Sequence, residues 1–148
     1  MMKRVCMALV GTLLASSPLG ADVEFHPMAG DTERSWPFSE AVRVGDLLFL
    51  SGMLGNRPGT SELAPGGIGP ETRQTLENIR DAIQRHGGSM DRVAKCTVFL
   101  ADIAEWGAMN AVYVEFFPTN RPARSALGAS GLALGARVEI ECIAVVED

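Results

Sequence analysis

Alternating apolar and polar residues predict several strands in this chain. The clearest is ARVEIECIAVV (136–146), one side of which carries Val138, Ile140, Cys142 and Ala144. Its other side carries Glu139, Glu141, Ile143 and Val145. The remaining stretches are AVRVGDLLFLSG, which the Gly45-Asp46 turn signal divides into two strands or one bent hairpin, RVAKCTVFL and ARSALGA (41–52, 92–100 and 123–129).

A spacing of three to four residues between apolar positions predicts the first helix, over residues 71–86. Leu76, Ile79 and Ile83 form its apolar stripe. The residues before it, 55–70, are rich in glycine and proline and predict a flexible loop. This loop lacks the Gly-Lys-Ser/Thr ending of a P-loop, which argues against a phosphate cradle.

The second helix is predicted to begin at Asp102, with Glu105 three residues later as the partner in a capping box. Pro118 ends it. We expect its apolar stripe to lie in the core; the stripe consists of Trp106, Met109, Tyr113 and Phe116.

The predicted order of elements is therefore β-β-α-β-α-β-β, in one α+β domain. Two helices placed among the strands in this way would cover one face of a single sheet. On the other face, the last strand carries Ile143 and Val145 beside Glu139 and Glu141. Because an exposed apolar patch of this kind marks an interface, we expect the helix-free face to pack against another subunit.

Residues 1–21 have the three-part layout of a secretory signal peptide. A basic start, MMKR, precedes an apolar run of 11 residues, and small residues follow in SSPLGA. The apolar run is too short to span a bilayer comfortably. Cleavage after Ala21 would leave residues 22–148 as a single domain, exported to the periplasm or secreted, with no membrane anchor.

The domain that remains is acidic. Loss of Lys3 and Arg4 changes the 13 basic and 18 acidic residues to 11 and 18, a net charge near −7. Lys95 is the only remaining lysine, and no basic cluster is present. Nucleic-acid binders need a basic face to meet phosphates, so we expect no nucleic-acid partner.

Two cysteines remain after processing, Cys96 and Cys142, each within a predicted strand. A pair in an exported protein could form a disulfide. Two cysteines in mid-strand are more often small buried residues, and this is the interpretation that we favour. His26 and His86 have no close spacing to either cysteine, so we expect no zinc or copper site.

Arg124 lies in RPARSALG (121–128), a run of small and apolar residues that reads as the start of a buried strand. An arginine keeps its charge, so it needs an anion wherever it is buried. If the last two strands share a sheet, Arg124 and either Glu139 or Glu141 would share its subunit-facing side. Two interpretations follow: an interface salt bridge, or a pocket between subunits in which Arg124 grips a ligand carboxylate and a glutamate holds a water.

Five segments together resemble successive motifs of the Rid family, the reactive intermediate deaminases also called the YjgF family. They are PFSEAVRVGDLLFLSG, ETRQTLENI, VFLADIAEWGAMNAVYVEFFP, RPARSALG and RVEIECIAV. The resemblance implies a chorismate-mutase-like fold, a homotrimer with ligand sites in the clefts between subunits, and no metal or cofactor. It also implies hydrolysis of 2-aminoacrylate and 2-imino acids to 2-keto acids and ammonia.

The resemblance also implies roles for individual residues. Arg124 would bind the substrate carboxylate and Glu139 would position the attacking water. The cleft would be lined by Gly52, Ser51, Asn110, Phe38 and Ala126. Phe38 replaces a tyrosine and Ala126 replaces a cysteine that many members carry, which bears on substrate preference more than on fold.

Two other functions compete with the deaminase. One is a non-catalytic trimer that binds a small carboxylate in the same cleft. The retention of both Arg124 and Glu139 favours catalysis, because a pure binder could lose the glutamate. The other is ribonuclease activity, a label attached to relatives, which the acidic charge disfavours.

Overall fold

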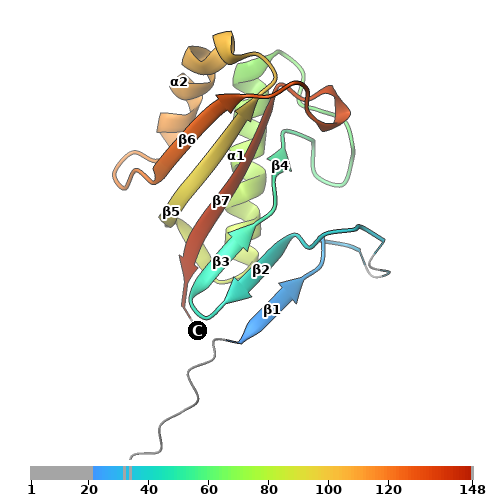
Figure 1. The fold of residues 1–148 in the computed structure, drawn as a ribbon, viewed down its shortest axis with the longest axis vertical. Helices are drawn as coiled ribbons and strands as arrows, with labels where there is room; N and C mark the ends of the chain where they lie inside the picture. Colours follow the sequence, from blue (N-terminus) through green and yellow to red (C-terminus); the bar gives the residue numbers. More distant parts are fainter. Residues whose placement is uncertain (1–21, 32, 34, 148) are drawn as a thin grey trace, which may run out of the picture.

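The structure is a computed structural model that describes residues 22–31, 33 and 35–147, so the predicted signal peptide at 1–21 lies outside the described residues. Seven strands and two helices build one domain (Figure 1). The strands are β1 (Val23–His26), β2 (Ala41–Val44), β3 (Leu47–Leu50), β4 (Met53–Leu54), β5 (Gly88–Leu100), β6 (Ala123–Gly128) and β7 (Val138–Val146). The helices are α1 (Ile68–Arg85) and α2 (Trp106–Phe116), with short 3₁₀ turns at Ile103–Glu105 and Ala133–Gly135.

The strands form a single mixed sheet in the order β1-β2-β3-β7-β5-β6, with β4 paired to β7. Neighbouring strands are antiparallel except β5 and β6, which run parallel. Both helices lie on one face of the sheet, behind the strands in Figure 1. The α+β fold with two helices on one face of one sheet is therefore confirmed.

Two strands extend the predicted order. The strand β1 lies outside the strands predicted from the sequence and pairs with β2, from Val23 opposite Val44 to His26 opposite Ala41. The segment β4 has only two residues and pairs with β7. Both strands are too short for alternation to identify them from sequence.

The second helix starts differently from the prediction. The Asp102 carboxylate accepts a hydrogen bond from the Ala104 backbone N–H at 2.9 Å, which caps the 3₁₀ turn before α2. Glu105 does not complete the capping box, because its carboxylate instead accepts from Arg137 Nε at 3.0 and 3.1 Å. The predicted core stripe is also wrong at Trp106, which is 42% exposed, whereas Met109 is buried.

The core lies between the sheet and the two helices. The inward side of β7 is buried as predicted, with Val138, Ile140 and Ala144 fully covered. These residues pack against the α1 stripe of Leu76, Ile79 and Ile83. Burial of such a continuous apolar layer is the main force that holds this fold together.

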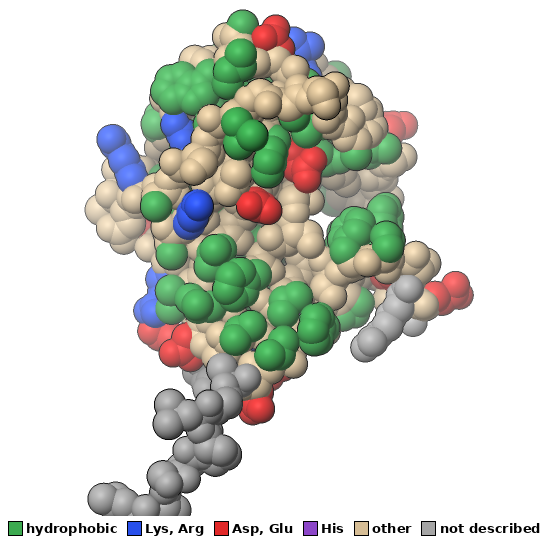
Figure 2. Space-filling view, in the orientation of Figure 1, with side chains coloured by type: hydrophobic (Ala, Val, Ile, Leu, Met, Phe, Trp, Pro, Cys, Tyr) green, Lys and Arg blue, Asp and Glu red, His purple; other side chains and the backbone are tan. Residues whose placement is uncertain are grey.

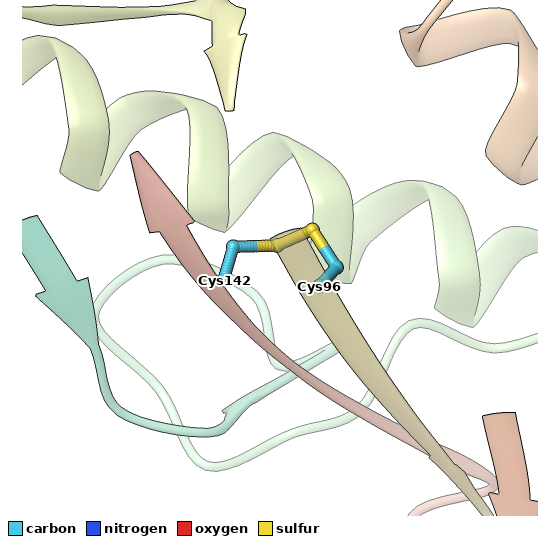
Figure 3. Close-up of a disulfide and its surroundings, with 2 residues drawn as sticks. All are labelled: Cys96 and Cys142. Carbon is cyan, nitrogen blue, oxygen red and sulfur yellow. A yellow bond between two sulfur atoms is a disulfide. The ribbon is translucent and has the colours of Figure 1, made fainter. Parts of the chain in front are cut away.

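The preference for free buried cysteines is wrong, because Cys96 and Cys142 form a disulfide between β5 and β7 (Figure 3). They are directly opposite each other in the antiparallel pair, with Cα atoms 4.1 Å apart. Both side chains are buried on the helix-covered side of the sheet. The two cysteines are 46 residues apart in sequence, and the register of β5 against β7 brings them together. Local sequence patterns do not reveal this register.

The helix-free face of the sheet is partly apolar. Figure 2 shows this face, with apolar side chains gathered over β1, β2 and β3 and acidic side chains near its centre. Exposed large side chains here include Val23, Phe25, Leu47 and Phe49. This distribution fits the expectation that the face packs against another surface.

Candidate functional site

Arg124 lies on the helix-covered side of the sheet. It pairs with Cys96 in the parallel β5–β6 register, and Cys96 pairs with Cys142 on the buried side of β7. Since directly paired residues point to the same face, Arg124 points toward the helices. The prediction that Arg124 shares the helix-free face with Glu139 or Glu141 is therefore wrong.

The guanidinium of Arg124 rests against two aromatic rings of α2. Its Cζ lies 4.5 Å from the ring centroid of Tyr113 and 5.4 Å from that of Trp106. Both distances fall within the range of cation–π attraction. Among the described residues, no carboxylate lies within 4.0 Å of this side chain. The arginine is thus half-buried, held by rings, and open to an external anion.

Asn110 shares a side of α2 with these rings. Trp106, Asn110 and Tyr113 follow one another at spacings of four and three residues, which places them on one face of the helix. Ala126 follows Arg124 on the same side of β6 and packs against the core. We call these residues, with Arg124, the arginine half-site.

The hydroxyl of Tyr113 is buried and has no hydrogen-bond partner in the described part of the chain. Burial raises the pKa of Tyr113 to about 12, partly opposed by the nearby positive charge of Arg124. The phenol therefore stays neutral at physiological pH and keeps a donor beside the guanidinium.

Glu139 lies on the other face of the sheet. It pairs with Phe99 of β5, three residues from Cys96, so its side chain points away from the helices. Burial, and secondly the neighbouring carboxylate of Glu141, raise the pKa of Glu139 above its ordinary value. A carboxylate with a raised pKa is a better proton acceptor, which suits a general base.

Gly52 makes room for this carboxylate. A Cβ atom at position 52 would lie 2.0 Å from Glu139 Oε1, far inside van der Waals contact. The absence of a side chain at Gly52 therefore allows the Glu139 carboxyl to lie against the backbone after β3.

Ser51 supports the segment that carries Phe38. Its Oγ donates to the Ser39 carbonyl at 2.7 Å, and its backbone N–H donates to the Glu40 carbonyl at 3.0 Å. A cavity of about 490 Å³ lies on this side. Its lining consists of Phe25, Pro27, Asp31, Trp36, Pro37, Phe38, Ser39, Val42 and Ser51. We call Glu139, Gly52, Ser51 and Phe38 the glutamate half-site.

The predicted site residues thus fall into two groups on opposite faces of one sheet. The arginine half-site lies beside α2, and the glutamate half-site lies beside the segment from β2 to β4. The rings of Trp106 and Tyr113 were not predicted to belong to the site, because their spacing is also that of a core stripe. Their position three and four residues from Asn110 is the signal that links them to it.

Neither a metal-binding cluster nor a membrane-spanning helix is found in the part of the chain that the structure describes. Within residues 22–31, 33 and 35–147, no group of three or more His, Cys, Asp or Glu side chains could hold a metal ion. The described helices include none that is long and apolar enough to cross a membrane.

Comparison with known proteins gives consistent matches. The family model described as Endoribonuclease L-PSP matches residues 31–146. A 2-iminobutanoate/2-iminopropanoate deaminase of Capra hircus is 43% identical over 109 residues, 74% of this chain and 80% of the goat protein.

Solved structures match as well. YyfA of Yersinia pestis, described as a protein of unknown function of the conserved Rid family, is 37% identical with a TM-score of 0.71, covering 74% of this chain and 88% of that one. E. coli TdcF with bound serine is 31% identical with a TM-score of 0.71, covering 76% of this chain and 90% of TdcF.

Proposed function

Since this chain belongs to the Rid (YjgF) family, matched by the Endoribonuclease L-PSP model over residues 31–146, we propose that it is a hydrolytic deaminase. Its substrates would be 2-imino acids and their enamine tautomers such as 2-aminoacrylate, and its products 2-keto acids and ammonia. The identity of 43% to a 2-iminobutanoate/2-iminopropanoate deaminase supports this reaction class.

The observation that carries the proposal is the environment of the Arg124 guanidinium. A half-buried guanidinium with no carboxylate within 4.0 Å among the described residues is a receptor for an anion. Its planar fork matches a carboxylate with two parallel hydrogen bonds. Every 2-imino acid carries such a group, next to the reacting carbon.

Glu139 would act on the water. The ionised carboxylate accepts a proton as the water oxygen forms a bond to the imine carbon, giving a tetrahedral carbinolamine. Glu139 passes this proton to the imine nitrogen as the carbinolamine forms. It then takes the proton of the new hydroxyl and delivers it to the amino nitrogen, the C–N bond breaks, and ammonia leaves as the carbonyl of the keto acid forms. The imine is already electrophilic, so orientation of the substrate and one water suffices.

The placement of the two half-sites supports a site shared between subunits. Because Arg124 and Glu139 occupy opposite faces of the sheet, a small substrate cannot touch both within one chain. We propose a homotrimer in which the arginine half-site of one subunit meets the glutamate half-site of its neighbour. The partly apolar helix-free face, with exposed Leu47 and Phe49, would be covered in this assembly.

We also propose that the protein is exported, to the periplasm or beyond the cell. The layout of residues 1–21 supports this, and so does the disulfide between Cys96 and Cys142. Disulfides persist in oxidising compartments and are rare in the cytosol. An exported deaminase would meet imines formed outside the cytoplasm, for instance by amino-acid oxidases.

Binding without turnover is the second candidate function, and the relative TdcF with bound serine favours it. The raised pKa of Glu139 favours catalysis, because a mere binder gains nothing from a basic carboxylate in the cleft. Ribonuclease activity suits the acidic chain poorly, since 13 basic residues face 18 acidic ones.

The test is the half-life of freshly generated 2-iminopropanoate with and without the purified protein, beside an Arg124→Ala variant. We expect faster hydrolysis that disappears in the variant. An unchanged half-life with a folded trimer would reject the deaminase and leave a carboxylate-binding protein.

A further inference from the structure

The cavity beside the glutamate half-site has largely aromatic walls. Three aromatic rings stand around it with unusually large exposure: Phe25 at 64%, Trp36 at 55% and Phe38 at 49%. The rings of Trp36 and Phe38 meet at an angle of 56°, with centroids 5.6 Å apart. Exposed apolar groups gathered around a hollow indicate a binding surface.

Asp31 holds the backbone of Ser35 and Trp36 beside the cavity. The Asp31 carboxylate accepts from the backbone N–H and the hydroxyl of Ser35, both at 3.1 Å, and from the Trp36 backbone N–H at 3.3 Å. These contacts use both oxygens of Asp31, the one charged group in the lining. Asp31 thus anchors the Trp36 backbone beside the cavity, and the surface offered to a ligand is mainly apolar.

The cavity opens on the same face of the sheet as Glu139. Phe25 pairs with Val42, Val42 with Phe49, and Phe49 with Ile143, so these four side chains form one cross-strand row on the helix-free face. On β7, Ile143 follows Glu139 by an even number of positions, so both side chains lie on this face.

The cavity is linked to the Glu139 carboxylate by two consecutive residues. Ser51 lines the cavity, and the next residue, Gly52, lies against the carboxyl of Glu139. A substrate whose imine carbon is next to Glu139 can therefore extend its side chain past Ser51 toward the rings. A methyl side chain would leave most of a volume of about 490 Å³ unfilled.

We propose that this cavity, which we call the aromatic pocket, receives the side chain of the imino acid, and that Trp36 makes the enzyme prefer 2-imino acids with large apolar side chains. This inference rests on the proposed deaminase function. The preferred substrates would be imines derived from aromatic amino acids such as phenylalanine. A stacked ring buries more surface and gains an aromatic contact that a methyl group cannot make.

The experiment compares kcat/KM for the 2-imino acids derived from phenylalanine, alanine and arginine, each freshly generated. We expect the wild type to favour the phenylalanine-derived imine over the alanine-derived one by about tenfold or more. Trp36→Ala should remove most of this preference, by lowering kcat/KM for the phenylalanine-derived imine more than for 2-iminopropanoate. Trp36→Leu, which keeps an apolar side chain in the loop, should retain part of it.

Leu134→Ala is the matched control, since Leu134 is 59% exposed and outside the pocket. It should keep the wild-type ratio. A ratio unchanged in folded Trp36→Ala, or a wild-type preference for the alanine- or arginine-derived imine, would overturn the inference while leaving the deaminase standing. Weakened trimer association in Trp36→Ala with an unchanged ratio would instead assign the rings to the subunit interface. Hydrolysis of none of the three imines would reject the proposed function, and this inference with it.

Discussion

Arg124 and Glu139 lie on opposite faces of one β-sheet, although only one strand, β5, separates the strands that carry them. Arg124 points toward α2, where Tyr113 and Trp106 hold its guanidinium. Glu139 points to the helix-free side, against Gly52. A substrate small enough for this reaction cannot reach both from one chain, so the proposed catalytic pair must come from two copies.

The contact between Gly52 and Glu139 predicts that Gly52→Ala impairs catalysis without unfolding the protein. The new methyl would occupy the place of Glu139 Oε1, and the flexible carboxyl would move aside. We expect kcat/KM to fall by about 10- to 100-fold, because a displacement of about 1 Å can cost this much. The melting temperature should change little.

Gly107→Ala is the matched control for this substitution, because a Cβ there meets nothing within 4 Å. It should keep wild-type activity. Equal activity of the two variants would show that the position of the Glu139 carboxyl does not matter for turnover.

The raised pKa of Glu139 predicts the pH dependence of kcat/KM. The base works only when ionised, so activity should fall as pH drops through a pKa above that of an ordinary glutamate. Glu141→Gln removes the second cause of the shift and should move this acidic limb to lower pH, while burial keeps it partly raised. Glu77→Gln on α1 removes the same charge elsewhere and should leave the limb in place. If the acidic limb of Glu141→Gln stays at the same pH as in the wild type, Glu139 is not the titrating base.

Arg124 should not be replaceable by lysine. Arg124→Lys keeps the positive charge but loses the planar fork and its stacking on Tyr113 and Trp106. We expect a drop in kcat/KM of roughly tenfold for lysine and of about 100-fold or more for alanine. Steady-state kinetics on 2-iminopropanoate would measure both. Full activity of the lysine variant would mean that a point charge is enough.

The disulfide predicts a stability that depends on redox conditions. Reduction should lower the free energy of unfolding by about 2–5 kcal/mol, the usual effect of losing a native bridge. Urea titrations with and without dithiothreitol would measure this. The double variant Cys96→Ala/Cys142→Ala should unfold at the same urea concentration in both conditions. A wild-type midpoint insensitive to reductant, with free thiols detected before unfolding, would contradict the bridge.

Local patterns predicted most of the fold. The alternation in residues 136–146 identified β7 and its buried side, and the stripe of Leu76, Ile79 and Ile83 identified α1. Alternation reports which side of a strand is buried, so these predictions needed no knowledge of neighbours. The edge strand β1 was not predicted, because four residues are too few to show a clear alternation.

The failures all concern relations between distant segments. Cys96 and Cys142 pair because of the β5–β7 register, which no local pattern contains. The face on which Arg124 lies was predicted wrongly for the same reason. Alternation within one strand shows which residues share a side, but not which side faces the helices. Trp36 lies in a segment with neither strand alternation nor helical spacing, and its position beside the cavity depends on the contact of its backbone with Asp31.

The most direct test of a site shared between two copies is complementation. Arg124→Ala and Glu139→Gln chains, each inactive alone, would be co-expressed with different tags, and mixed trimers purified through both. Every mixed trimer has an intact Arg124 opposite an intact Glu139 in one of its three clefts, so activity on 2-iminopropanoate should recover to about a third of the wild-type value. Mixed trimers no more active than either variant alone would contradict a site built from two subunits.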